Sequence, residues 1–166
     1  MNKFMEQAIA IKDDIVEYRR VIHSNPEVGA ELPKTKAYVM DKLREFGYEP
    51  EEICESGIVA TIEGSKPGKT FLLRADMDAL PMAEATDCDF KATNGAMHSC
   101  GHDMHTAMLL GAAKLLKQNQ DEIEGTVKLV FQPDEEGFTG AKKMIEAGVL
   151  QNPKVDAAMA MHVNSG

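Results

Sequence analysis

The fold of this chain is decided by the stretch Thr70-Phe71-Leu72-Leu73-Arg74-Ala75-Asp76. Its continuous apolar run is typical of a strand buried in a sheet, and it ends in a carboxylate. Residues 58–63 also have strand character, and glycine and proline between 64 and 68 predict a turn that joins the two. Further along, residues 127–131 and 155–162 predict two more strands.

Helical periodicity fills the gaps between these strands. Apolar residues at three- and four-residue steps predict helices over residues 103–118 and 139–147, and near the N-terminus over about 3–24 and 35–46. Strands that alternate with helices favour right-handed crossovers. The predicted fold class is therefore α/β, with a mainly parallel sheet flanked by helices.

The composition and charge of the chain restrict the classes of protein to which it can belong. The 166 residues are 43% hydrophobic and 27% charged, which is typical of one globular domain. The net charge of -9 argues against a nucleic-acid or anionic-membrane surface, because either needs clustered Lys and Arg. We expect a soluble, cytoplasmic protein: the first residues lack the apolar core of a signal peptide, and three cysteines without a spaced framework indicate reduced thiols.

Chemically active side chains follow the predicted strands. In open α/β sheets the ligand crevice lies beyond the carboxyl ends of the strands. Asp76 and Asp78 lie at the end of the strand that begins at Thr70. Glu135 and Glu136 follow the strand over residues 127–131, and His162 ends the strand over residues 155–162. We therefore expect these segments to converge on one rim, together with the residues that open the helix at 103.

That helix is preceded by a dense cluster of metal donors, His98-Ser99-Cys100-Gly101-His102-Asp103-Met104-His105. Imidazole, thiolate and carboxylate are the donors that divalent transition metals take. A buried thiol beside a capping histidine is the alternative for Cys100 and His102, but two-residue spacing in an extended loop would point both donors the same way. His98 fits hydrogen bonding to substrate or to a ligand better than ligation, and His105 fits a supporting role better than ligation.

Two aspartates have both a structural and a functional interpretation. Asp103 is placed to cap the helix and meet its dipole, or alternatively to hold a histidine ligand in one tautomer. Asp76 is either a turn residue or an orienting carboxylate, and the crowding of Arg74 and Asp78 at the same strand end favours the second. We place both among the supporting residues.

The pair Glu135-Glu136 is the candidate for acid–base chemistry. Adjacent charges usually mark a solvated face, but these follow an apolar strand and Pro133, where successive side chains diverge. One can then bind metal while the other acts as a general base.

Several motifs, in order and across nearly the whole chain, carry a family resemblance. They are Arg19-Arg20 with Ile22-His23 and Pro26-Glu27, then residues 73–81, 97–113 and 131–136, and finally Met161-His162-Val163. In these the chain resembles the metal-dependent amidohydrolases of the aminoacylase and hippurate hydrolase type, which include N-acyl-amino-acid, N-acetyldiaminopimelate and auxin-conjugate hydrolases.

The resemblance implies a site and a reaction. It implies two divalent metal ions, Zn²⁺ or Mn²⁺ in preference to Co²⁺ or Ni²⁺, with Cys100, His102, Glu136 and His162 as ligands and Glu135 as general base. Arg74 stands where related peptidase branches have a histidine ligand. The substrate would be a small N-acyl amino acid of the N-acetyl or N-benzoyl type, cleaved at its amide bond to a carboxylic acid and an amino acid.

The resemblance also implies a longer protein. Family members insert a lid and dimerisation domain after the strand that ends at His162 and then return with a last histidine ligand. On this basis residues 1–166 are expected to be the N-terminal part of the catalytic metal-binding domain, and the full-length form a homodimer. Two alternatives remain: an inactive metal-binding fragment that needs its missing part or a partner chain, and a thiol hydrolase with Cys100 as nucleophile.

Overall fold

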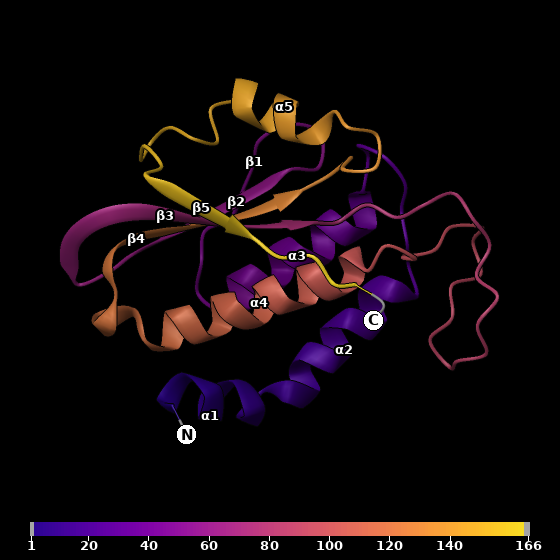
Figure 1. The fold of residues 1–166 in the computed structure, drawn as a ribbon, viewed down its shortest axis with the longest axis horizontal. Helices are drawn as coiled ribbons and strands as arrows, with labels where there is room; N and C mark the ends of the chain where they lie inside the picture. Colours follow the sequence, from indigo (N-terminus) through magenta and orange to yellow (C-terminus); the bar gives the residue numbers. More distant parts are fainter. Residues whose placement is uncertain (1, 165–166) are drawn as a thin grey trace.

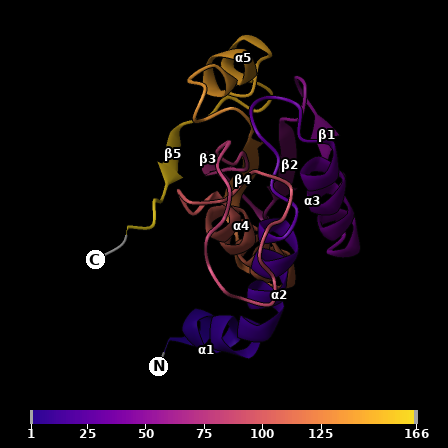
Figure 2. The ribbon, with the colours of Figure 1, turned by 90° about the vertical axis from the view of Figure 1, so that its right-hand side faces the viewer.

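The structure, a computed structural model, describes residues 2–164 and confirms the α/β class. A five-stranded sheet lies between one helix on one face and four on the other (Figures 1 and 2). The strands are β1 (Glu51–Glu52), β2 (Ile58–Glu63), β3 (Lys66–Asp76), β4 (Glu124–Gln132) and β5 (Ala157–Ala160). The helices are α1 (Lys3–Ala10), α2 (Lys12–His23), α3 (Pro33–Glu45), α4 (His102–Gln118) and α5 (Gly140–Glu146), with a short 3₁₀ turn at Gln120–Glu122.

The sheet is mixed, with the order β1-β2-β4-β3-β5. Strands β3, β4 and β5 run parallel, as expected, whereas β2 runs antiparallel to both of its neighbours. The tight turn at residues 64–65 reverses the chain between β2 and β3, but β4 lies between these two strands. Because β4 is parallel to β3, β2 must oppose it.

Alternation along β3 divides the core between the two faces of the sheet. Leu72 packs with Val130 and Met144 beneath α5, while Ala75 belongs to the larger core shared with α2, α3 and α4. The expected buried run is not buried throughout, because Phe71 is 39% exposed. Its partner in β5 is Ala157, whose small side chain in an edge strand covers little of the ring.

The expected N-terminal helix is broken in two at Ile11, whose backbone leaves the helical conformation. Helix α2 lies very close to α4: a Cβ at Gly111 would be 2.7 Å from the Ile15 side chain. The break lets α1 turn and follow α4, where Gln7 exchanges hydrogen bonds with Asn119. Periodicity predicted the apolar face of α2, where Tyr18 and Ile22 are buried, but not that of α1, where Phe4 is 48% exposed and no residue is buried. It also carries no signal for this change of direction.

The three parallel strands end at the same edge of the sheet, where the first turn of α4 and the loop over residues 77–101 also lie (Figure 1). This arrangement positions the candidate site. Within residues 2–164, no helix combines the length and apolar character needed to cross a membrane.

Candidate metal centre

His102 occupies the first position of α4 and is almost completely buried. Its Nδ1 donates to the backbone carbonyl of Asp78 at 2.8 Å, which fixes the tautomer and leaves the Nε2 lone pair free. No described residue hydrogen-bonds to Nε2. Carboxylate oxygens of Asp76 and Glu135 lie 3.8 Å from it, and one of Glu136 lies at 3.9 Å.

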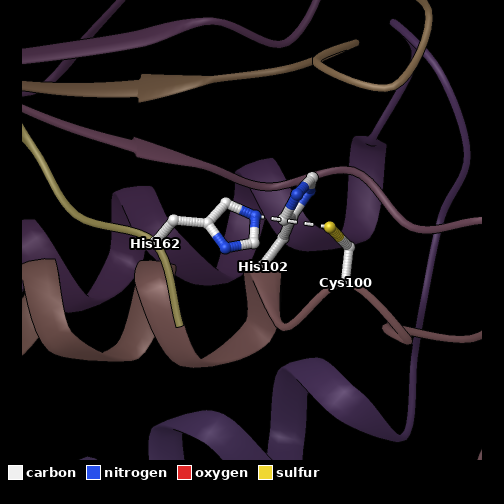
Figure 3. A group of neighbouring side chains, drawn as sticks. All are labelled: Cys100, His102 and His162. Atoms are coloured by element: carbon white, nitrogen blue, oxygen red, sulfur yellow. Dashed lines mark hydrogen bonds between the residues drawn. The ribbon is translucent and has the colours of Figure 1, made fainter. Parts of the chain in front are cut away.

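Cys100 and His162 approach the same place from two other segments. Figure 3 shows the three side chains pointing toward one another, with Cys100 Sγ 3.4 Å from His162 Nε2. Their donor atoms and one from His102 all lie within 4.8 Å of each other. Sulfur and nitrogen donors at this spacing fit a divalent transition metal.

The turn between Cys100 and His102 is made by Gly101 at φ +86°, not by the extended loop that the two-residue spacing suggested. That conformation favours glycine, and a Cβ there would lie 2.4 Å from the Val163 side chain. Cys100 and His102 do converge, as expected. The expected cause was wrong, because a left-handed turn at Gly101 and the start of α4 bring the two donors together.

Asp78, which was expected at this rim but was given no role there, holds the backbone of the pair Glu135-Glu136. Its two carboxylate oxygens accept the backbone N–H groups of Glu135 at 2.9 Å and Glu136 at 3.1 Å. Burial alone would raise the pKa of Asp78, but the His102 ring and these two N–H groups outweigh it and lower the pKa below its usual value. One aspartate therefore fixes both His102 and the acidic pair, and the only signal for it in the sequence is the spacing Asp76-Met77-Asp78.

The two glutamates differ in environment. Glu136 Oε1 is buried and has no hydrogen-bond partner in the described part of the chain, whereas the Glu135 side chain is about one-third exposed. Burial, together with Glu136, Glu135 and Asp76, raises the pKa of the Cys100 thiol to about 11. The thiolate form of Cys100 is thus disfavoured unless a cation compensates these carboxylates.

His105 and Asp76 form a supporting pair. Asp76 Oδ1 accepts from His105 Nδ1 at 2.6 Å, and Oδ2 accepts from Arg74 at 2.7 Å. His105 Nε2 accepts the Val163 N–H at 3.0 Å. Both ring nitrogens of His105 are therefore engaged, and the backbone just after His162 is fixed by them.

Asp103 lies in the first turn of α4, where its carboxylate meets the helix dipole as expected, but it makes no capping hydrogen bond, which corrects that part of the first interpretation. Its Oδ2 instead accepts from Arg19 Nε at 3.0 Å and His23 Nδ1 at 2.8 Å. The other nitrogen of His23 faces Glu84 at 3.0 Å. Asp103 thus holds His23 rather than a proposed ligand of this centre, in a chain of contacts that runs from Arg19 through Asp103 and His23 to Glu84.

His98 is 5% exposed, and neither ring nitrogen has a hydrogen-bond partner within residues 2–164. Burial lowers its pKa to about 4, so the ring is neutral at neutral pH. It faces an open pocket of about 590 Å³ that also borders Cys100 and His162. Among the residues that the structure describes, His98 joins no group of metal donors that contains Cys100 or His102.

An α/β fold with thiol, imidazole and carboxylate donors gathered at its strand ends is typical of metal-binding α/β proteins. The sequence profile of peptidase family M20/M25/M40 matches residues 72–166, and the chain belongs to this family.

Relatives and solved structures agree. Thermostable carboxypeptidase 2 of Saccharolobus solfataricus is 47% identical over 170 residues, which span 99% of this chain and 43% of that protein. The N-acyl-L-amino acid amidohydrolase of Geobacillus stearothermophilus is 40% identical over 92% of this chain and 42% of its own length. A crystal structure of a dinuclear metal-binding M20 peptidase from Bacillus subtilis superposes with a TM-score of 0.89 at 39% identity, covering 93% of this chain and 44% of that one. The chain therefore spans less than half the length of the relatives it matches.

Proposed function

We propose that this chain carries the metal centre and the general base of an enzyme that hydrolyses the amide bond of N-acyl amino acids. The observation that carries the proposal is the buried Nε2 atom of His102, unpartnered among residues 2–164 and surrounded by three carboxylate oxygens at 3.8–3.9 Å. These separations are too long for hydrogen bonds, and they fall within the upper limit of about 4.4 Å between two donor atoms that each lie about 2.0–2.2 Å from one metal ion.

Cys100, His102, Glu136 and His162 are the proposed ligands of two divalent ions. The unpartnered Oε1 atom of Glu136 supports its assignment as a ligand in preference to Glu135. Zn²⁺ suits the thiolate and Mn²⁺ the carboxylates. Four side chains do not complete the coordination of two ions, so water, substrate or further side chains would supply the rest.

When bound, the metals would polarise the scissile carbonyl and make water more acidic. Glu135 is the proposed general base. Its backbone is fixed by Asp78, and its partly exposed carboxylate can reach solvent and substrate. It would take a proton from the attacking water and deliver it to the leaving amine.

The proposed substrate class rests on similarity to named relatives. Relatives at 40–42% identity are named N-acyl-L-amino acid amidohydrolase and N-acetyl-L-cysteine deacetylase, and one at 48% identity is named an IAA-amino acid hydrolase.

The three free cysteines support a reducing compartment such as the cytoplasm.

The test is hydrolysis of N-acetyl and N-benzoyl amino acids by the intact protein, after chelation and after addition of Zn²⁺, Mn²⁺ or Co²⁺. We expect activity that disappears with the metal and returns with it. Activity that persists in the metal-free protein would instead favour Cys100 as a nucleophile. The raised pKa of the Cys100 thiol argues against that mechanism, because a cysteine nucleophile needs a lowered one.

A further inference from the structure

A second group of metal donors lies near the candidate centre and shares no residue with it. It consists of His23 at the end of α2 and of Glu84 and Cys88 in the loop over residues 77–101. One donor atom from each of the three residues lies within 4.8 Å of the other two. Imidazole, carboxylate and thiolate are all ligands that Zn²⁺ takes in proteins.

Asp103 orients His23 in the way that a supporting carboxylate orients a metal-bound histidine. Its Oδ2 atom accepts from His23 Nδ1 at 2.8 Å, and the opposite ring nitrogen, Nε2, lies 3.0 Å from Glu84 Oε1. With its hydrogen on Nδ1, a neutral imidazole presents a lone pair at Nε2. That lone pair and the carboxylate oxygen are both acceptors, so a proton or a cation must lie between them.

Glu84 is held rigidly from its other side. Its side chain is 1% exposed, its second oxygen accepts the Ala92 N–H at 2.6 Å, and Thr86 donates to Oε1. Glu84 Oε1 also lies 4.0 Å from Cys88 Sγ. An oxygen and a sulfur bound to one Zn²⁺ ion can be up to about 4.3 Å apart, so this separation fits a shared ion.

Cys88 is free to turn toward a cation. It forms no disulfide, and among the described residues its sulfur has only weak hydrogen-bond contacts, at 3.6 Å to Thr86 and 4.0 Å to Glu84. His23, Glu84 and Cys88 all line the open pocket of about 590 Å³. An ion can therefore enter from solvent, and water can complete a tetrahedral coordination.

We propose that His23 Nε2, Glu84 Oε1 and Cys88 Sγ bind a zinc ion at a site separate from the candidate centre, with water as the fourth ligand. Zn²⁺ would replace the proton between His23 and Glu84 and the thiol proton of Cys88, so two protons leave for each ion bound. The thiolate and imidazole favour Zn²⁺ over Mg²⁺. The bound ion would join the loop to the end of α2. This site does not depend on the proposed hydrolytic function.

The first test is alkylation of the intact, reduced protein with iodoacetamide, followed for each cysteine by mass spectrometry. Zn²⁺ at about ten times its Kd should slow alkylation of Cys88 about tenfold, because only the unbound fraction reacts, and EDTA should reverse the effect. Glu84→Gln should abolish the protection. The matched control is Asp87→Asn, an exposed neighbour outside the pocket lining, which should keep it. Alkylation of wild-type Cys88 at the same rate with and without Zn²⁺ would overturn the proposal.

Zinc content gives an independent measurement, since Glu84→Gln also removes contacts that hold the loop. Cys88→Ala leaves the contact between His23 and Glu84 in place. After dialysis against a zinc buffer that saturates the wild type, it should contain one zinc ion fewer per chain. Cys54→Ala, which replaces a free cysteine outside the pocket lining, should contain as much zinc as the wild type. Equal zinc contents in Cys88→Ala and the wild type would overturn the site.

Cys100→Ser separates this site from the candidate centre, because it removes the thiolate proposed for that centre. In this variant Zn²⁺ should still protect Cys88 from alkylation. Loss of the protection would show that Cys88 is shielded only through the candidate centre, and it would overturn a separate site. Retained protection would support the site whether or not the protein hydrolyses N-acyl amino acids.

Discussion

The Nδ1 atom of His102 donates a hydrogen bond to the backbone carbonyl oxygen of Asp78, 2.8 Å away. The same aspartate uses its carboxylate to accept the backbone N–H groups of Glu135 and Glu136. A single residue at the end of β3 therefore orients one proposed metal ligand and fixes the segment that supplies another ligand and the base. Partners of this kind commonly tune both metal affinity and ligand geometry.

Asp78→Asn should weaken metal binding. The asparagine amide can accept one of the two backbone N–H groups, but its NH₂ faces the other, so the acidic pair loses its position. We expect metal affinity to fall about 10–100-fold, measured by competition with a chromophoric chelator. Asp89→Asn, at an exposed position, is the control, and equal affinities in the two variants would argue against this role.

Glu135→Gln and Glu136→Gln should fail in different ways. Glu135→Gln is expected to retain metal and lose roughly 10²–10⁴-fold in kcat, because it removes only the proton acceptor. Glu136→Gln is expected to lose metal as well, because its buried oxygen is the proposed ligand atom. Metal content by mass spectrometry beside kcat distinguishes them, and an undiminished rate in Glu135→Gln would remove it from the role of base.

Acid should destabilise the protein partly through Glu84. Burial would raise the pKa of this carboxyl, but hydrogen bonds from Thr86, His23 and the Ala92 N–H lower it to about 2 from 4.5. A lowered pKa stabilises the folded state above the unfolded value of 4.5, and that contribution disappears as the pH falls from 4.5 toward 2. It amounts to at most about 3 kcal/mol.

Urea unfolding with EDTA present, at pH 7 and pH 3, measures this contribution without interference from metal loss. The wild type should lose more stability between these pH values than Glu84→Gln does. Equal losses would mean that the Glu84 carboxylate contributes nothing to the pH dependence.

Lys128 should be a strong determinant of stability away from the site. It is 2% exposed in β4, and its ammonium group donates to the carbonyl oxygens of Val149, Gln151 and Pro153. Lys128→Met leaves these carbonyls without their donor, and we expect a loss of about 2–4 kcal/mol in chemical denaturation. The exposed Lys69→Met is the control, and a similar small effect in both variants would contradict this role.

Much of the fold follows from periodicity. The apolar stripe of α4 predicted its helix to within one residue, because burial imposes a period of 3.6 on helices. The continuous apolar run predicted the C-terminal part of β3, but the strand already begins at Lys66, within the predicted turn. The place of β4 between β2 and β3, and the break at Ile11, depend on contacts between segments distant in sequence, which local patterns do not encode.

The site could be predicted only in part for the same reason. Donor types and strand ends pointed to Cys100, His102, the pair Glu135-Glu136 and His162, and the family resemblance implied Glu136 as the ligand of that pair. The structure brings these segments together. The role of Asp78 could not be predicted, because it depends on backbone N–H groups more than fifty positions away. The contact between Asp103 and His23 could not be predicted from the sequence either, because His23 lies on α2, 80 positions away.

The central claim is that Cys100 ligates a metal together with His102, Glu136 and His162, and Co²⁺ substitution tests it most directly. Because Cys88 is proposed to bind metal at a second site, the titration uses the chelated, reduced Cys88→Ser protein. Co²⁺ should produce a thiolate-to-cobalt charge-transfer band that is absent after the further substitution Cys100→Ser and retained after Cys54→Ser. A Cys88→Ser protein that shows no such band, or a band that persists when Cys100→Ser is added, would contradict the account.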